Sequence, residues 1–175
     1  TVLYNTVINE TEASVTKPIE GVSERILSCA TEEFLEKGYS DASLRTIAAK
    51  AGTTTGSIYS RFKDKEGLFA AIVGPVAEYM MNLFVKTQEE FHAVEPERQP
   101  KEMDDYVISG MDEMLDYIYD NFTTFQLLLE ASYGTKFQNF VEQLAEVEAE
   151  YTYKFMEVIH FQNEEENEVT GEFIH

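Results

Sequence analysis

The feature that most constrains this chain is the spacing of its apolar residues. From Ile19 almost to the C-terminal end, apolar side chains recur every three or four residues, as they do on the buried face of an amphipathic helix. No apolar-polar alternation typical of a β-strand runs for a useful length after residue 20. The spacing therefore predicts an all-α fold, with a small bundle near the N-terminus and a larger helical bundle after it.

Turn and capping residues predict where the first helices begin and end. The first apolar stripe runs from Val22 to Leu35, and Gly38 should end that helix in a left-handed conformation. Short polar residues then precede three further apolar segments, and each can accept a hydrogen bond from a free N–H group of the first helical turn. The three predicted N-caps are Ser43 before residues 44–51, which are followed by Gly52, Thr54 before residues 55–62, and Asp64 before the helix that opens at Lys65.

Beyond Asp64 the pattern is helical almost throughout. The helix that opens at Lys65 should kink or break at Gly74-Pro75, because proline lacks an N–H group and clashes with the carbonyl four residues earlier. The polar residues 92–101 are predicted to form a loop. Further helices are predicted over residues 103–118, 122–132 and 137–161, with breaks at Gly134 and at residues 163–167.

The chain is strongly acidic, but its charge is unevenly distributed. Its 175 residues carry a formal net charge of −20, which at first argues against a nucleic-acid partner, because duplex DNA repels acidic surfaces. Residues 17–74, however, hold eight basic and eight acidic side chains, whereas residues 75–175 hold five basic and 23 acidic ones. The two parts differ electrostatically, and only the first is compatible with DNA.

Cysteine content and hydropathy indicate a compartment. Cys29 is the single cysteine, which excludes an intramolecular disulfide framework and fits a reducing compartment, so we expect a cytoplasmic protein. No stretch approaches the roughly 20 apolar residues needed to span a bilayer, and residues 1–20 lack the basic-then-apolar order of a secretory signal. We expect no membrane partner.

Residues 43–62, SLRTIAAKAGTTTGSIYSRF, have the order of a helix-turn-helix. In that motif the first helix crosses the DNA backbone, and the second offers its N-terminal side chains to base edges in the major groove. The start of a helix also directs unpaired N–H groups at a phosphate, which the turns before Thr55 and Lys65 would each provide.

The motif and its flanks resemble the DNA-binding domain of the TetR family of bacterial repressors over roughly residues 22–73. The resemblance implies a homodimeric, ligand-responsive transcription factor. It rests on Phe34, Gly38-Tyr39, Ser43-Leu44, Ile47-Ala48, Ala51-Gly52, Gly56-Ser57-Ile58-Tyr59, Phe62, Lys65-Glu66 and Leu68.

The resemblance also implies roles for individual side chains. Ser43, Thr54, Tyr59 and Lys65 would contact phosphates, whereas Thr53, Thr55, Ser57 and Ser60 would face bases or the neighbouring backbone, and Arg45 is a further candidate for DNA contact. Thr53 and Ser60 depart from the residues common in the family, so base preference does not transfer.

A plainer interpretation stands beside each of these roles. Tyr59 could be a core aromatic residue, and Arg61 and Lys63 could be ordinary solvated charges. Packing between the two helices is the expected role of Ile47, Ala48, Ala51, Ile58 and Phe62.

The acidic half carries no family-wide motif, so effector-binding candidates rest on composition. Methionine and aromatic residues fill irregular cores and also line adaptable cavities. Glu113 and Glu130 lie near apolar stripes, and a carboxylate in a cavity would favour a cationic ligand. A lipophilic or cationic effector is therefore expected, although core packing or solvation could explain each residue. The candidates are Met80, Phe84, Tyr106, Met111, Glu113, Met114, Tyr117, Phe125, Glu130, Tyr151 and Phe155.

No catalytic group or cofactor site is predicted. The three histidines and one cysteine offer no grouping of nucleophile, base and orienting residue, and no glycine-rich phosphate loop is present. Glu157, His160 and Glu164 share a helical side, but di-iron bundles need two such Glu-x2-His copies, so no metal is expected.

These patterns predict three segments. Residues 1–17 should be a disordered extension or an addition to the natural chain, residues 18–73 the DNA-binding domain, and residues 74–175 a helical effector-binding and dimerisation domain. Residues 168–175 are interpreted as the first turns of a further helix, so some of the dimer interface is expected to be missing.

The predicted function is regulation of transcription. A homodimer would repress by binding a palindromic operator and would be released by a small molecule, with Gly74-Pro75 as a hinge. A ligand-independent architectural DNA binder of the same fold is the alternative. An acidic interaction module or enzyme with an incidental motif is a more distant one.

Overall fold

The computed structural model describes the backbone of residues 21–172 and the side chains of residues 21–160. The described residues form helices and no strand, which confirms the all-α prediction. The predicted extension over residues 1–17 lies outside the described residues. The helices are α1 (Val22–Asp41), α2 (Leu44–Lys50), α3 (Thr55–Phe62), α4 (Lys65–His92), α5 (Gln99–Asp120), α6 (Phe122–Glu130) and α7 (Phe140–Glu172).

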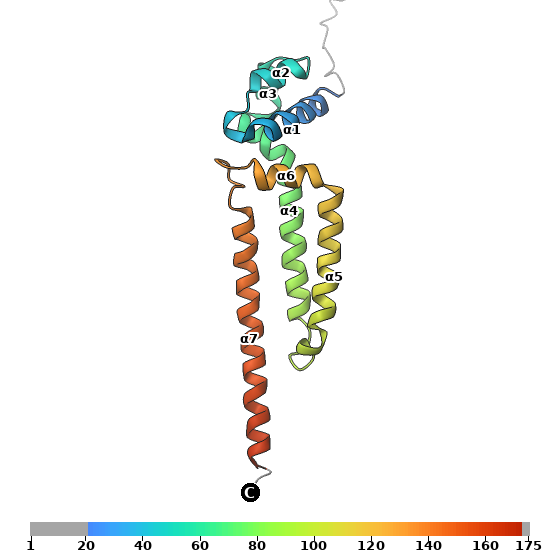
Figure 1. The fold of residues 1–175 in the computed structure, drawn as a ribbon, viewed down its shortest axis with the longest axis vertical. Coiled ribbons are helices and arrows are strands. Elements are labelled where there is room, and N and C mark those ends of the chain that lie inside the picture. The colour runs from blue at the N-terminus through green and yellow to red at the C-terminus, as the bar shows by residue number, and fades with distance from the viewer. Residues whose placement is uncertain (1–20, 173–175) are drawn as a thin grey trace, which may run out of the picture.

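The helices divide into a head and a longer helical part, joined by α4 (Figure 1). Helices α1, α2 and α3 gather at one end of the molecule. Helix α4 runs from that head into the other half, where α5 and α7 lie on either side of it, and α6 lies crosswise between the head and these long helices (Figure 1). The C-terminal part of α7 extends past the ends of α4 and α5.

Capping explains the boundaries of the head helices. Ser43, Thr54 and Asp64 accept hydrogen bonds from the N–H groups of Thr46, Ser57 and Gly67, at 3.4, 3.1 and 2.7 Å respectively. Gly52 ends the α2 segment with a φ of 64°. All three predicted N-caps are confirmed.

Gly38 interrupts α1 but does not end it. Its φ of 72° is positive, as predicted, although its ψ of 168° lies outside the left-handed helical region. One more turn follows, because the Ala42 N–H donates to the Gly38 carbonyl at 3.2 Å. The Tyr39 N–H, freed by the interruption, donates to the carbonyl of Ala131 at the end of α6, at 3.1 Å.

Of the kink or break predicted at Gly74-Pro75, the break is wrong, because α4 continues through Pro75 to His92, and the kink stays a prediction. Proline removes one backbone hydrogen bond, but tertiary packing holds the helix on both sides of it. Val73 is fully buried, and Val76 and Ala77 are at most 7% exposed.

Two other predicted interruptions also differ from the structure. The loop after α4 covers only residues 93–98, because α5 already begins at Gln99. Helix α7 continues through residues 163–167, whose glutamates are good helix formers. Residues 168–172 are therefore the end of α7 and not the start of a further helix, while the predicted turn at Gly134 is confirmed by its φ of 85°.

Helix α4 also corrects the prediction that no stretch is long and apolar enough to span a bilayer. It meets that criterion by length and composition, because Glu78 is the only charged residue between Glu66 and Lys86. In this fold α1, α5, α6 and α7 pack against it, so its apolar character also serves the core.

One apolar core extends from the head into the other half. Its fully buried members include Phe34 of α1, Ile58 of α3 and Phe69 near the start of α4, and Leu127 and Leu128 in α6. The boundary between residues 73 and 74 therefore stays a prediction, because α4 contributes to the core on both sides of it.

Candidate nucleic-acid interface and effector cavity

Helix α3 presents a polar face to solvent. Ile58 is fully buried and Phe62 packs against the core, so both lie on the inward face. The Tyr59 side chain is 53% exposed, which excludes the alternative that it is a core aromatic residue. Thr54 and Ser60 are exposed as well, and Thr53, Thr55 and Ser57 are half-buried. The residues predicted to contact DNA are therefore not enclosed by the fold.

The capping hydroxyls keep a donor for an external partner. Ser43 and Thr54 use their oxygens to accept from backbone N–H groups. A hydroxyl that accepts one hydrogen bond still has its own O–H to donate, so capping and phosphate contact are compatible. Arg45, in the first turn of α2, is exposed.

Arg61 has a role that the sequence did not indicate. Its guanidinium donates to the Ser57 hydroxyl oxygen at 2.6 Å and to the Ser57 carbonyl at 3.3 Å. The Ser60 hydroxyl donates to the same carbonyl at 3.1 Å. Ser57, Ser60 and Arg61 thus form one polar group on the exposed side of α3, and the four-residue spacing of Ser57 and Arg61 was the available signal.

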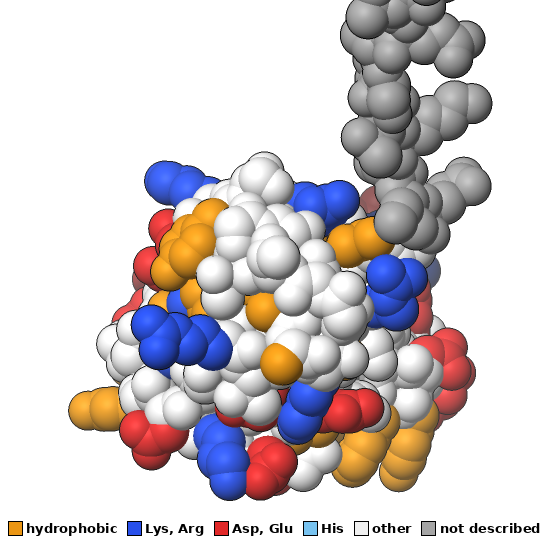
Figure 2. Space-filling model, turned by 90° about the horizontal axis from the view of Figure 1, so that it is seen from above, with side chains coloured by type: hydrophobic (Ala, Val, Ile, Leu, Met, Phe, Trp, Pro, Cys, Tyr) orange, Lys and Arg blue, Asp and Glu red, His pale blue; other side chains and the backbone are white. Residues whose placement is uncertain are grey.

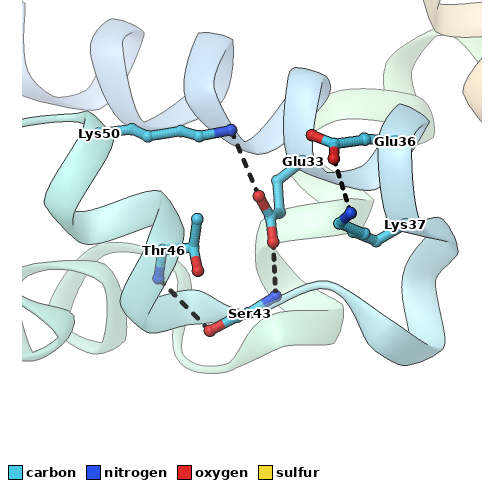
Figure 3. A network of polar contacts seen from close by, with 6 residues as sticks. All are labelled: Glu33, Glu36, Lys37, Ser43, Thr46 and Lys50. Carbon is cyan, nitrogen blue, oxygen red and sulfur yellow. Dashed lines mark hydrogen bonds and ion pairs between the residues drawn. The ribbon is translucent and has the colours of Figure 1, made fainter.

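A buried carboxylate holds α2 in position (Figure 3). Glu33 of α1 is 4% exposed, and one of its oxygens accepts from the Ser43 N–H at 3.2 Å while the other lies 3.4 Å from the Lys50 ammonium. Ser43 is the N-cap and Lys50 the last residue of α2, so a single side chain contacts both ends of that helix. Arg25 of α1 adds a bond to the Ala51 carbonyl at 3.3 Å.

Lys65, the first residue of α4, lies at the end of α1. Its ammonium donates to the Ser40 carbonyl at 2.9 Å and lies 4.9 Å from the centre of the Tyr39 ring. Burial lowers the pKa of Lys65 below its usual value. A phosphate contact by Lys65 stays a prediction, and it would have to coexist with these internal contacts.

The face at the head end carries dispersed basic side chains. Figure 2 looks onto this end of the molecule and shows Lys and Arg side chains around a centre of small uncharged side chains and backbone, with acidic side chains mainly towards the edges. Cations around a neutral surface suit the phosphate backbone of a duplex, since phosphates position a protein and bases are read between them.

The other candidate site is a cavity of about 350 Å³ between α4, α5 and α7. Its walls are mainly apolar, and five aromatic residues take part in them. Phe91 is central, with ring centres 5.6 Å from Tyr106 and 5.4 Å from Phe155. The lining residues are Phe84, Thr87, Gln88, Phe91, His92, Met103, Tyr106, Val107, Gly110, Met111, Met114, Glu148, Tyr151, Thr152 and Phe155.

The structure brings six of the eleven predicted effector residues to this cavity: Phe84, Tyr106, Met111, Met114, Tyr151 and Phe155. The other five lie elsewhere. Met80 and Phe125 are at most 5% exposed in the core, and Tyr117 packs on Tyr79 with ring centres 4.2 Å apart. Glu113 is exposed, and Glu130 is exposed and accepts from Gln126 at 3.0 Å.

Several lining residues were missed because the sequence shows spacing but not which helices meet. Phe84, Gln88 and Phe91 share a helical face by their separation, as do Glu148 and Thr152. The spacing within each helix was therefore visible in the sequence. Only the contact between α4 and α7, however, shows that these two faces line the same cavity. Of the disfavoured metal ligands, Glu157 and His160 are exposed on α7, and the Glu164 side chain lies outside the described residues.

Burial lowers the pKa of the His92 imidazole, which is the largest effect on that group. The backbone of Tyr151 acts in the opposite direction, and the charge of Lys154 acts with burial. The imidazole ring centre lies 5.2 Å from that of Tyr151. At neutral pH this wall of the cavity therefore favours a neutral imidazole.

Comparison with known proteins places the similarity in the head. A sequence model described as "Bacterial regulatory proteins, tetR family" matches residues 26–72. The "HTH-type transcriptional repressor BepR" of Brucella suis is 45% identical over 51 residues, which are 29% of this chain and 24% of that protein. The "HTH-type transcriptional regulator UidR" of Escherichia coli is 33% identical over 86 residues, covering 49% of this chain and 41% of that protein.

A solved structure extends over more of the chain. A transcriptional regulator from Aquifex aeolicus aligns over 88% of this chain and 80% of its own, with 24% identity and a TM-score of 0.47. The sequence matches cover much less, since the chain spans about a quarter of the length of relatives such as BepR. Within residues 26–72 the matched sequence coincides with the capped helices and the buried face described above, so over this segment the chain is similar in sequence to the tetR family of bacterial regulatory proteins.

Proposed function

We propose that this chain is a cytoplasmic DNA-binding transcriptional regulator that acts as a repressor. In this proposal a homodimer binds a palindromic operator and is released by a small-molecule effector. The observation that carries the proposal is α3: its inward face is anchored by the fully buried Ile58, and its outward face presents Tyr59 and Ser60 to solvent. The naming of the Brucella suis relative as a repressor supports the direction of regulation.

Specific recognition by so short a helix requires a dimer. Two recognition helices about 34–36 Å apart meet successive major grooves on one side of a palindrome. Exposed apolar side chains on α7 support such pairing, since Val141 and Met156 are both 58% exposed. Covering them against a second copy would remove apolar surface from water.

The cavity supports a ligand-responsive regulator over the ligand-independent architectural alternative. A space of about 350 Å³ with mainly apolar walls falls within the size range of small-molecule sites. By linkage, an effector that prefers the conformer with misplaced recognition helices must weaken DNA binding.

Helix α6 is the proposed connection between cavity half and head, in place of a hinge at Pro75. The Tyr39 N–H bonds the Ala131 carbonyl at 3.1 Å, and Phe137, just before α7, has its ring centre 6.3 Å from that of Phe69. A shift of α6 would therefore displace α1 through the hydrogen bond between Tyr39 and Ala131. If Phe137→Leu leaves effector-induced release unchanged, this connection is refuted.

The test of DNA binding is selection of fragments from random duplex DNA by the full chain, followed by retardation of the selected duplex at several salt concentrations. We expect a palindromic consensus. Lys65→Ala should weaken binding to all sequences and lower the salt slope by about one, whereas Thr55→Val should change base preference. Failure to retard any duplex at low salt would refute the proposal, and sedimentation of the retarded species checks the dimer.

A further inference from the structure

We infer that the cavity between α4, α5 and α7 takes a lipophilic organic cation, with Glu148 as the group that selects its charge. This inference rests on the proposed function in so far as the ligand would be the effector. The cation would be a compact ammonium or similar group carried on an apolar or aromatic body. The sequence pointed to Glu113 and Glu130 for such a role, but neither lines the cavity.

Aromatic rings supply the first half of the argument. Phe84, Phe91, Tyr106, Tyr151 and Phe155 all line the cavity. The face of an aromatic ring attracts a cation, and clusters of such rings are how proteins recognise quaternary ammonium groups. Tyr151 already shows this chemistry, because the Lys154 ammonium lies 4.2 Å from its ring centre.

Glu148 supplies the second half, because among the described lining residues it is the only acidic or basic one apart from His92. Its carboxylate accepts from the Gln88 amide at 2.6 Å and from the Thr152 hydroxyl at 3.4 Å. Both donors are neutral, so they orient the carboxylate without cancelling its charge. A ligand that covered Glu148 without bringing a positive charge would remove water from an unpaired anion, which is unfavourable.

The surrounding groups do not favour the other ligand classes. The Lys154 ammonium, which lies 4.2 Å from the ring centre of the lining residue Tyr151, is paired with Glu150 at 2.7 Å. Burial disfavours the charged form of His92, so the imidazole supplies no compensating positive charge at neutral pH. An anionic ligand would therefore meet a carboxylate and no unpaired cation among the described lining residues. A neutral ligand would lack the charge that the aromatic rings and the Glu148 carboxylate both attract.

The probes are three matched ligands with the same phenol body: 4-hydroxybenzyltrimethylammonium, its neutral carbon isostere 4-neopentylphenol, and 4-hydroxyphenylmethanesulfonate. Calorimetric titration of the full chain with each should give a dissociation constant for the cation at least about tenfold below that of the isostere, from charge pairing and cation–π attraction combined. Sulfonate binding should be the weakest. Equal affinity for cation and isostere, or tighter binding of the sulfonate, would overturn the inference.

Substitutions identify the carboxylate. Glu148→Gln should remove most of the preference for the cation and leave affinity for 4-neopentylphenol unchanged, and Glu148→Lys should reverse the preference towards the sulfonate. Glu146→Gln is the matched control, because Glu146 is exposed on α7 and does not line the cavity. An unchanged preference in both Glu148 variants would overturn the assignment, and circular dichroism checks that they fold.

Retardation of the selected duplex, with and without each ligand, separates this inference from the proposed function. A chain that retards DNA but binds none of the three ligands overturns the inference alone. A chain that binds the cation with the Glu148 dependence but retards no duplex supports the inference about the cavity and refutes the proposed function.

Discussion

The head and the cavity half bury their apolar residues to different extents. Seven of the nine largest fully buried side chains lie between Ile26 and Val73, and the other two are Leu127 and Leu128 of α6. Among the large apolar side chains that are exposed, Tyr59 is the only one in the described part of the head, whereas 13 lie between Tyr79 and Met156. The head completes its own packing, while α5 and α7 leave apolar surface for a ligand or a second copy to cover.

The difference teaches where function is located in each region. In the head, packing fixes the angle of α3, and a thin layer of small polar side chains meets the outside. In the cavity half, the proposed function depends on incomplete packing, because a closed core would leave no space for an effector.

The largest expected effect comes from removing a buried side chain in the head. Ile58→Ala should destabilise the chain by about 3 kcal/mol, from lost apolar burial and the remaining cavity, and should abolish DNA binding at 37 °C. Ile108→Ala, on the exposed face of α5, is the matched control and should cost less than about 0.5 kcal/mol. Denaturant unfolding measures both, and equal losses would contradict the contrast between the regions.

Glu33→Gln should have the next largest effect. It keeps the acceptor for the Ser43 N–H but removes the charge opposite Lys50, so we expect a loss of about 1–2 kcal/mol and weaker DNA binding through a displaced α2. Glu36→Gln is the control, because Glu36 and Lys37 form an exposed pair. DNA affinity at a temperature where both variants are folded distinguishes positioning from stability.

Gly56→Ala tests whether the outward face of α3 meets a duplex closely. A methyl group there would contact only the Thr54 hydroxyl oxygen, at 3.7 Å, so stability should rise slightly, by about 0.5 kcal/mol. DNA affinity should nevertheless fall, since the added methyl group would hinder close approach of the backbone. Unchanged affinity in retardation assays would argue against a contact at this point.

The smallest expected effect is a pH dependence from His92. Because burial lowers its folded-state pKa below the unfolded value, His92 contributes stability at pH above that unfolded value, and this contribution is lost as the pH falls through the lower folded-state pKa. Melting temperatures between pH 8 and pH 5 should therefore fall slightly more for the natural chain than for His92→Gln. Parallel curves for the natural chain and the His92→Gln variant would contradict a lowered folded-state pKa of His92.

Local signals were sufficient for most of the head. Ser43, Thr54 and Asp64 act as N-caps as predicted, because capping depends on residues only three positions apart. The predicted break at Pro75 was wrong for the complementary reason: it was a local inference from one residue, whereas the packing of Val73 and Val76 keeps α4 helical on both sides of Pro75. Arg61 and Glu33 were not anticipated as contacts, and Glu33 bonds residues that lie 10 and 17 positions away.

The amino-acid sequence by itself determined the all-α class, the caps and the family of the head, because these depend on periodicity and on short-range hydrogen bonds. Only the tertiary structure decided which of the many apolar and acidic residues after Gly74 face the cavity. The reason is physical: α4, α5 and α7 each have a helical stripe, and what lies opposite a stripe depends on contacts between segments up to 60 residues apart, such as Gln88 with Glu148.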